Sequence, residues 1–407
     1  MTRGNHYDSI VRLHGHLIDS LTLAKVFDEI LDRGGDYESE EISIGRTKKD
    51  LSIAKIRVTA PDPEILSSIL KRLHQLGASV EHEEEIVLEK AKMDGVFPDG
   101  FYATTNLPTE VFYQSEWRAV ENIGMDCGVE WDHERLKASS IKMNDVKKDH
   151  DYVVGIQGIR VQPQNEAIHS NKFRFMNSDV STEKPKGIYI KQIAEQLRTI
   201  KNSDDEAIFV CGPAVVHTGA RDYLCQLIEG GYVHRIFAGN ALAVHDIEAA
   251  LYGTSLGVSL AEGLNTSGGH RNHLYAINTI RSLGGIKKAV EQGILKNGIM
   301  YSCIKHDCSF LLAGSIRDDG PLPEVITDAV QAQSMMREKV KKAKLVVMLS
   351  TMLHSIAVGN LLPASVQTVC VDISPSTVTK LMDRGSHQAM GLVMDVEAFL
   401  HELCEYL

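Results

Sequence analysis

The stretch LVVMLSTMLHSIAVGNLLPASVQTVCVDI, residues 345–373, carries one formal charge, the carboxylate of Asp372. Apolar runs rich in valine occupy its two ends, at 344–350 and 366–373, and polar residues and Pro363 separate them. Buried parallel strands are continuous apolar runs of this kind, so the pattern predicts two strands joined through a helix. The stretch is long enough to cross a membrane, but its polar interruptions favour a globular interior.

The same alternation of helix and apolar strand extends from residue 187 to the end of the chain. Further strands are expected at 207–211, 233–238 and 310–313, and a glycine follows each of them. Helices are expected at 190–200, 218–229, 241–252, 286–292, 324–343 and 396–406. Because strands separated by helices form a parallel sheet covered on both faces, residues 187–407 are expected to form a Rossmann-like, doubly wound nucleotide-binding domain.

Residues 1–95 follow a different order, β-α-β-β-α-β. The strands are expected at 11–18, 37–45, 51–59 and 79–81, and the helices at 21–31 and 61–77. This is the order of a ferredoxin-like α+β module, which commonly serves regulation or assembly. Between the two domains, residues 96–186 show short strand patterns and the pair Trp117 and Trp131, which indicate a small β-rich connecting region. The fold class is therefore α/β, with three regions.

The composition excludes several classes of protein. A chain of 407 residues with 43% hydrophobic and 24% charged residues is neither disordered nor collagen-like, and it can form two or three hydrophobic cores. A net charge of −11 argues against a nucleic-acid partner, because binding phosphates requires clustered lysine and arginine. The expected partners are small molecules and further copies of the chain, a homo-oligomer, with no membrane.

Seven cysteines, an odd number, do not form a disulfide framework. Reduced thiols in the cytoplasm are the simpler interpretation. The first residues, MTRGNHYDSIVRLHGHLIDS, contain charges and histidines throughout and no apolar segment of the kind that export signals carry. We therefore expect a cytoplasmic protein.

Ligands of doubly wound sheets collect where the strands end, so the turns after the strands are the candidate sites. The first two turns are Cys211–Gly219 and Ala238–Asp246. In each, a glycine allows backbone N–H groups to approach an anionic ligand at the start of a helix, and Asn240 and Ala241 begin one such helix. The alternative is ordinary turn chemistry, with His217 and His245 as polar groups whose hydrogen bonds are satisfied.

The third candidate joins two neighbouring strand ends. One predicted strand ends in Ser350–Ser355, and the next ends at Asp372, roughly twenty residues later. A Rossmann unit holds the adenosine ribose with a carboxylate at this position, so the spacing favours a dinucleotide. The glycine fingerprint G-x-G-x-x-G is absent here, and a carboxylate that merely caps its strand is the alternative.

The fourth candidate is the loop Gly314–Pro323, which follows the apolar run 310–313. Its adjacent carboxylates, Asp318 and Asp319, could bind a ribose hydroxyl or the ammonium group of a basic substrate. A turn rich in aspartate and glycine with no ligand is equally consistent with the pattern.

Two further segments contain reactive residue types. Cys303, His306 and Cys308 lie within six positions, but no second ligand pair occurs at the spacing of a zinc site, and no metal is expected. Lys305 and His306 could instead transfer protons, or be plain loop residues. In the glycine-rich segment 262–273, Arg271 could clamp a substrate carboxylate, although exposed loop arginines are common.

Read together, four motifs resemble one family: GPAVVHTG at 212–219, AGNALAVHD at 238–246, GSIRDDGPLP at 314–323 and STMLHS at 350–355. They are similar to the archaeal-type ornithine cyclodeaminase family, whose members also form the C-terminal half of cyanobacterial bifunctional arginine dihydrolase/ornithine cyclodeaminases. The resemblance covers nearly the whole chain. It includes an N-terminal domain labelled lysine-oxoglutarate reductase/saccharopine dehydrogenase.

The resemblance implies a tightly held NAD on a C-terminal domain similar to that of deoxyhypusine synthase. Carried over by motif, the cofactor contacts would be Asn240, Ala241, Asp319, Thr351, Met352, Leu353, His354 and Asp372. The reaction implied is redox-neutral. Hydride leaves Cα of L-ornithine, the δ-amine attacks the resulting imine, ammonia departs, and the hydride returns to give L-proline.

This chemistry needs proton-transfer groups, a cation for the carboxylate and an anion for the δ-ammonium. Our hypothesis assigns these roles to Lys305 or His306, to Arg271 and to Asp318, respectively. Two alternatives remain open at this point. The chain could be a net oxidoreductase of the saccharopine type, or an NAD-binding sensor without catalysis.

Overall fold

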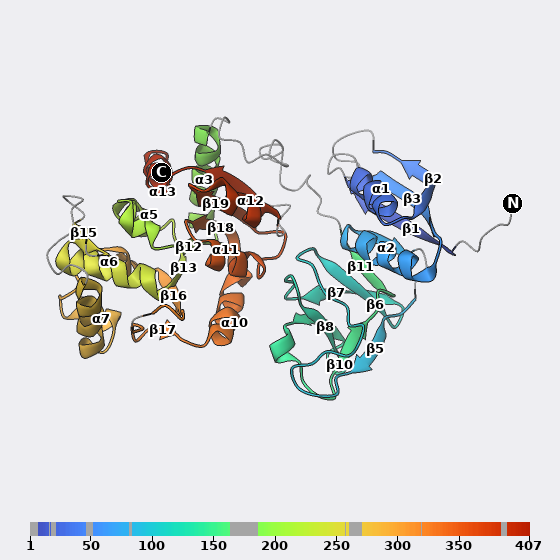
Figure 1. Cartoon of the computed structure of the whole chain (residues 1–407), viewed down its shortest axis with the longest axis horizontal. Helices are drawn as coiled ribbons and strands as arrows, with labels where there is room; N and C mark the ends of the chain where they lie inside the picture. Colours follow the sequence, from blue (N-terminus) through green and yellow to red (C-terminus); the bar gives the residue numbers. More distant parts are fainter. Residues whose placement is uncertain are drawn as a thin grey trace. The chain divides into compact units, whose positions relative to one another are not determined.

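The computed structural model describes residues 7–15, 17, 22–45, 52–80, 84–162, 186–256, 258–259, 271–318, 320–383 and 389–407. The chain divides into two compact units, Met1–Asn177 and Ser178–Leu407 (Figure 1). Within the described ranges, every helix is too short or too polar to cross a lipid bilayer.

The first sheet has the order β2-β3-β1-β4, with antiparallel pairing throughout. Its elements are β1 (Tyr7–Gly15), α1 (Thr22–Asp32), β2 (Asp36–Ser43), β3 (Ser52–Ala60), α2 (Pro63–Gln75) and β4 (Ala78–Val80). Residues of β3 alternate between buried and more exposed positions, as expected for a strand with one face on the core. Val26 and Ile30 of α1 and Ile69 of α2 are fully buried against that face. The predicted ferredoxin-like module is confirmed.

A second sheet in the same unit has the order β11-β6-β7-β9-β8-β10-β5. Its strands are β5 (Val87–Lys90), β6 (Thr109–Tyr113), β7 (Glu116–Glu121), β8 (Gly128–Asp132), β9 (Lys137–Ile141), β10 (Asp151–Val154) and β11 (Ile159–Val161). Trp131 is 3% exposed and packs with Val111, Val129 and Val153 in the core of this sheet. The β-rich middle region is thus present, and β5, from within residues 1–95, pairs with its strand β10.

The second unit contains a parallel sheet of order β17-β16-β13-β12-β18-β19-β20. Its strands are β12 (Glu206–Cys211), β13 (Arg235–Gly239), β16 (Ser309–Ala313), β17 (Val325–Ile326), β18 (Ala343–Leu349), β19 (Gln367–Asp372) and β20 (Ala389–Val393). The two strands of the opening stretch, β18 and β19, are neighbours, with Val347 opposite Val369. The prediction of a Rossmann-like, doubly wound domain is confirmed.

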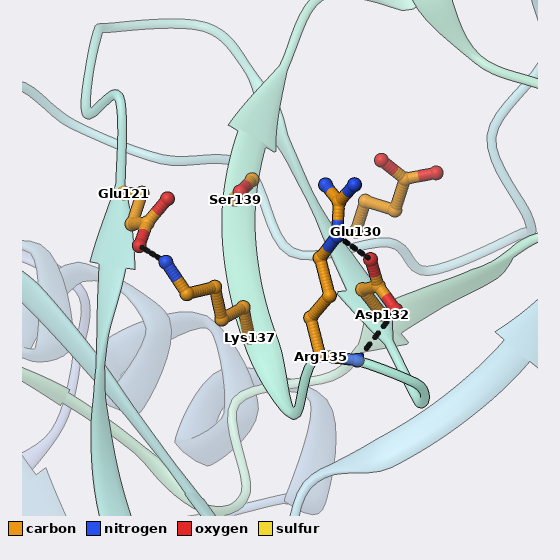
Figure 2. A pocket seen from close by; sticks show the side chains of 6 residues that line it. All are labelled: Glu121, Glu130, Asp132, Arg135, Lys137 and Ser139. Carbon is orange, nitrogen blue, oxygen red and sulfur yellow. Dashed lines mark hydrogen bonds and ion pairs between the residues drawn. The ribbon is translucent and has the colours of Figure 1, made fainter.

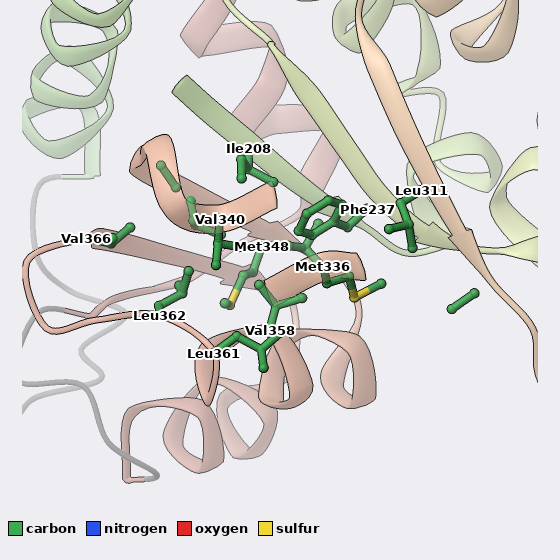
Figure 3. Packing of buried hydrophobic residues seen from close by; sticks show 14 of the residues in the cluster. Ile208, Phe237, Leu311, Met336, Val340, Met348, Val358, Leu361, Leu362 and Val366 are labelled. Atoms are coloured by element: carbon green, nitrogen blue, oxygen red, sulfur yellow. The ribbon is translucent and has the colours of Figure 1, made fainter. Parts of the chain in front are cut away.

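Helices cover both faces of this sheet (Figure 1). The helices of this unit are α3 (Lys186–Lys201), α4 (Ala214–His217), α5 (Arg221–Glu229), α6 (Asn240–Tyr252), α7 (Asn272–Leu283), α8 (Ile286–Glu291), α9 (Ile299–Lys305), α10 (Ala329–Lys339), α11 (Met352–Gly359), α12 (Pro375–Asp383) and α13 (Val396–Glu405). Figure 3 shows Phe237 and Met348 of the sheet facing Met336 of α10 and Val358 of α11. Because successive strand residues point to opposite faces, Val347 is buried on the other side, where α3 contacts β18.

Helix α10 is shorter than the helix predicted at 324–343. Val325 and Ile326 form β17 instead and pair with the end of β16. The side chain of Asp328 then accepts hydrogen bonds from the N–H groups of Val330 and Gln331, so the helix begins at Ala329. The helix therefore begins later in the chain than predicted, because β17 pairs with β16 and Asp328 caps the helix.

Candidate active site

The strand order reverses between β12 and β18. From β12 the chain proceeds through β13 and β16 to β17 at one edge, and then returns to β18 beside β12 and continues outward through β19 and β20. Ligands of doubly wound sheets bind in the crevice at the carboxyl ends of the strands where this reversal occurs. The turn that begins with Gly212 and the turn that begins with Ser350 border this crevice.

The two turns touch through their backbones. The N–H of Gly212 donates a hydrogen bond to the carbonyl of Leu349 at 2.8 Å. A Cβ atom at position 212 would lie 2.1 Å from the carbonyl oxygen of Ser350, far inside van der Waals contact. Ser350 itself has φ +48°, a left-handed conformation that non-glycine residues seldom adopt. At the reversal of strand order, the backbone of Gly212 thus lies very close to Ser350, and Ser350 itself has a strained conformation.

Helix α11 begins directly at this crevice. Thr351 precedes it with extended backbone, φ −146° and ψ 109°, and its side chain makes no capping hydrogen bond to the described backbone of the helix. The first N–H groups of a helix lack intrahelical acceptors and attract anions, so this end of α11 suits a phosphate. On the neighbouring strand, Asp372 uses one carboxylate oxygen to accept from the N–H of Ser374 at 2.8 Å. This hydrogen bond orients the carboxylate at the strand end, where ribose is expected.

His354 connects the turn after β18 with the turn after β13. A Cβ atom at Gly239 would lie 2.9 Å from Cε1 of His354, so the imidazole packs directly on this glycine. Burial lowers the pKa of His354, while the charge of nearby Asp318 opposes this effect. Asn240 is 3% exposed, and its side-chain oxygen accepts from the N–H of Leu322 at 3.1 Å. The structure thus brings together three of the predicted turns.

Apolar side chains are exposed around the same strand ends. Ile316 follows β16, Met352 and Leu353 follow β18, and Ile373 follows β19, with exposed fractions from 42% to 106%. Ala241, the second residue of α6, comes shortly after the end of β13 and is partly exposed. Exposed apolar groups that gather in this way mark a ligand or partner site. A dinucleotide, with its two flat rings and charged diphosphate, matches apolar side chains beside a helix N-terminus.

The remaining predicted site residues lie in different places. Asp318 accepts from the N–H of Ser315 at 2.9 Å and belongs to the loop after β16, at the carboxyl edge. Asp319 lies outside the described residues. Arg271 is exposed and immediately precedes α7, the helix that packs against α6.

Lys305 and His306 lie at the opposite edge of the sheet. They end α9 just before β16 begins at Ser309, and Arg235 at the start of β13 donates to the Ser309 hydroxyl at 2.7 Å. A strand of five residues separates them from the loop that carries Asp318. These two residues, to which the sequence hypothesis assigned proton transfer, thus precede their strand, whereas Asp318 follows it.

The cysteines near Lys305 are buried. Cys303 and Cys308 are 1% and 4% exposed. Contact with Cys308 and burial both raise the pKa of the Cys303 thiol. Within the described part of the chain, no three His, Cys, Asp or Glu side chains lie close enough together to hold a metal ion.

A polar group that the sequence had not singled out lies beyond the end of β12. Glu248, on α6, is fully buried and accepts hydrogen bonds from His245, from Thr254 and from the N–H of Leu256. His245 also packs against His217, with ring centroids 4.9 Å apart. The three-residue spacing of His245 and Glu248 on a helix places them on one face, which is the signal that could have identified the pair.

The cavity in Figure 2 belongs to the β-rich sheet of the first unit. It has a volume of about 350 Å³ and is lined by Glu121, Glu130, Asp132, Arg135, Lys137 and Ser139. Lys137 pairs with Glu121 at 2.6 Å, and Arg135 lies 3.8 Å from Asp132. Its cations therefore already have carboxylate partners, and the carboxyl edge of the parallel sheet remains the better candidate site.

Family models match consecutive parts of the chain. Residues 8–107 match the conserved region of the LOR/SDH bifunctional enzyme. Residues 108–190 match the first C-terminal region of the ArgZ-like arginine dihydrolases, and residues 191–403 match the Rossmann fold of the same proteins. The chain thus contains both C-terminal regions of the ArgZ-like proteins, with the first region followed by the Rossmann fold.

Whole-length relatives come from archaea. The chain is 51% identical to the ornithine cyclodeaminase of Methanopyrus kandleri, over 98% of this chain and 97% of the relative. It is 52% identical to the ornithine cyclodeaminase of Methanocaldococcus jannaschii, over 98% of this chain and 95% of the relative.

Solved structures of cyanobacterial bifunctional proteins are also similar. The apo structure of the arginine dihydrolase ArgZ matches with a TM-score of 0.86 and 37% identity, over 99% of this chain. The ternary complex of AgrE with ornithine and NAD+ matches with a TM-score of 0.53 and 41% identity, also over 99%. The chain spans 58% of each of these longer proteins.

Proposed function

Since the chain belongs to the archaeal-type ornithine cyclodeaminase family, we propose that it converts L-ornithine to L-proline and ammonia with bound NAD. The observation that carries this proposal is identity of 51% across 97% of an archaeal ornithine cyclodeaminase. The arginine dihydrolase activity named for the cyanobacterial proteins is not part of the proposal, because this chain spans 58% of their length.

The carboxyl edge of the parallel sheet fits NAD. The uncapped start of α11, from Thr351 to His354, would hold the diphosphate, and Asp372 would hold a ribose. Asn240 and Ala241, at the start of α6, would line the same crevice from the side of β13. When bound, NAD supplies a two-electron acceptor that later returns those electrons, so the reaction needs no outside oxidant.

Ornithine carries a carboxylate and two ammonium groups, and each requires a partner in the site. We propose that Arg271 binds the carboxylate and that Asp318, with Asp319 beside it in sequence, binds the δ-ammonium. Asp318 fits this role because it lies in the loop after β16 and its charge reaches His354. We assign proton transfer to groups at this same edge and not to Lys305 or His306, which precede β16.

The decisive experiment follows all products at once. Purified protein is incubated with L-ornithine, first without added NAD and then with trace NAD, while proline, ammonia and NADH are measured. Equimolar proline and ammonia without net NADH would support the proposal. Accumulating NADH would indicate a net oxidoreductase of the saccharopine type, and untouched ornithine with NAD still bound would indicate a sensor.

A substitution tests the assignment of the δ-ammonium partner. Asp318→Asn should raise KM for ornithine by about tenfold, the loss of about 1.4 kcal/mol from a charged contact, with little change in bound NAD. Asp204→Asn is the matched control, because Asp204 is exposed before β12, at the opposite edge of the sheet. An unchanged KM in Asp318→Asn would remove this assignment.

We further propose that the protein acts in the cytoplasm, in proline formation, as a homo-oligomer. Its seven cysteines are free thiols, which suits a reducing compartment. Light scattering at several concentrations would measure the oligomeric state, and a single mass near 45.0 kDa would refute the homo-oligomer.

A further inference from the structure

A histidine–glutamate network lies one short helix beyond the end of β12. Nδ1 of His245 lies 3.0 Å from Oε2 of Glu248, whose side chain is fully buried. The hydroxyl of Thr254 donates to Oε1 at 2.9 Å, and the N–H of Leu256 donates to Oε2 at 3.2 Å. Three donors thus surround this buried carboxylate, and each hydrogen bond favours its charged form.

The carboxylate fixes the state of His245. A carboxylate oxygen accepts from an imidazole N–H, so Nδ1 of His245 is the donor in this pair. The His245 ring is 9% exposed and lies edge-on to His217 and 6.4 Å from the ring of His273. This is an arrangement in which a buried acid holds an imidazole in a fixed orientation.

His217 is the member of the network that a ligand can reach. It is partly exposed, and it ends α4, the helix that follows β12 directly from the Gly212 turn at the crevice. Its Nδ1 lies 2.6 Å from the Ser255 hydroxyl, which holds the ring in place. The groups facing it are His245, which disfavours its cation, and Glu248, which favours it. Burial lowers its pKa to about 4, so it is a neutral imidazole at pH 7.

We propose that His217 exchanges protons with the amino groups of the substrate, that His245 and Glu248 position it, and that the charge of Glu248 favours its cation. This inference rests on the proposed function. The lone pair of His217 takes a proton from the substrate ammonium, which becomes a neutral amine, and the imidazolium later returns that proton to the departing ammonia. Ornithine cation gives proline and ammonium ion, so no net proton is gained or lost.

The position of Arg271 agrees with this assignment. The next residue, Asn272, donates from its side-chain amide to the Thr254 hydroxyl at 2.8 Å, and Thr254 in turn donates to Glu248. The proposed carboxylate partner is therefore the sequence neighbour of a residue that hydrogen-bonds to this network.

The test compares His217→Gln, His217→Ala and Glu248→Gln with His401→Gln in the NAD-loaded enzyme, with L-ornithine as substrate. His401 is a matched control because it is half-exposed on α13 and pairs weakly with Glu405, at 3.8 Å. His217→Gln should lower kcat by about 10²- to 10⁴-fold, the usual contribution of a general acid–base group. NAD per chain should stay unchanged, the acid limb of the pH profile should shift, and added imidazole should partly restore His217→Ala.

Three results would overturn the inference: kcat of His217→Gln within about threefold of wild type, loss of bound NAD in parallel with kcat, or an unshifted pH profile without imidazole rescue. Glu248→Gln alters a fully buried site, so its thermal midpoint and NAD content report whether it folds, and His217→Gln remains decisive. If wild-type protein makes no proline from ornithine, the proposed function fails and this inference fails with it.

Discussion

Replacing Gly212 with alanine tests whether the contact between the two turns organises the crevice. The added Cβ would meet the Ser350 carbonyl oxygen at 2.1 Å, whereas ordinary contacts begin near 3.4 Å, so one backbone must move by about 1.3 Å. Neither partner is a flexible side chain that could rotate away. Overpacking of this kind costs about 1–3 kcal/mol, and the smaller entropy of the unfolded alanine chain offsets about 0.4–1 kcal/mol.

The net loss is therefore about 1.3 kcal/mol. For a unit of this size, each kcal/mol lowers the midpoint of thermal unfolding by about 2–4 °C, so we expect a decrease of about 3–5 °C. The same displacement moves Thr351, which precedes α11, so NAD should bind more weakly. Thermal unfolding followed by circular dichroism and a calorimetric NAD titration measure the two effects.

Gly359→Ala is the matched control for this substitution. Its Cβ would find only the terminal methyl of Met348, at 3.8 Å, and the residue ends α11. Alanine in a helix is favoured over glycine by up to about 1 kcal/mol, so this variant should be as stable as wild type or more stable. Equal midpoints and equal NAD affinities for the two variants would refute the idea that Gly212 is required by the close approach.

Four further outcomes follow from the structure. Saturation with NAD at about 100 times its Kd should stabilise the wild type by about 2.7 kcal/mol in a denaturant titration, and no stabilisation would contradict binding. Phe399→Ala, at a fully buried position, should cost about 3–5 kcal/mol, whereas Ile188→Ala at a 59% exposed position should change the urea midpoint little. Asp246→Ala should cost about 3–5 kcal/mol, because this buried carboxylate accepts from an arginine and from two N–H groups at the start of α9; a change below 1 kcal/mol would contradict that role. Because the pKa of His217 is lowered from 6.5 to about 4, the unfolded chain binds a proton that the folded chain does not, so stability should fall as the pH drops from about 6.5 towards 4, and fall less in His217→Gln.

Hydrophobic pattern was sufficient to predict the layers of the fold. The central residues of strands β12, β13, β18 and β19 are apolar because both faces of the strands are buried, so their pattern differs from the alternating pattern of β3. Short strands were harder to predict. The two residues of β17 owe their conformation to pairing with β16, a contact that no local pattern encodes.

The buried polar network was not predictable from strand ends alone. Glu248 lies in the middle of α6, where a glutamate ordinarily faces solvent, and its direct neighbours Ile247 and Ala249 are apolar. Its burial depends on donors from Thr254 and Leu256, which follow the helix, and on His245 one turn earlier. Only the folded chain shows that these groups converge.

Strand direction explains why residues that are far apart in the sequence become neighbours at one edge of the sheet. Gly239 and His354 are far apart in the chain, yet both follow parallel strands, and parallel strands all end at the same edge of the sheet. Lys305 and His306 have suitable chemistry, but they precede β16 and are carried to the other edge. A reactive side chain in a doubly wound domain is thus a candidate for catalysis when it follows its strand. His217 satisfies that condition because only Gly212–Val216 separate it from β12.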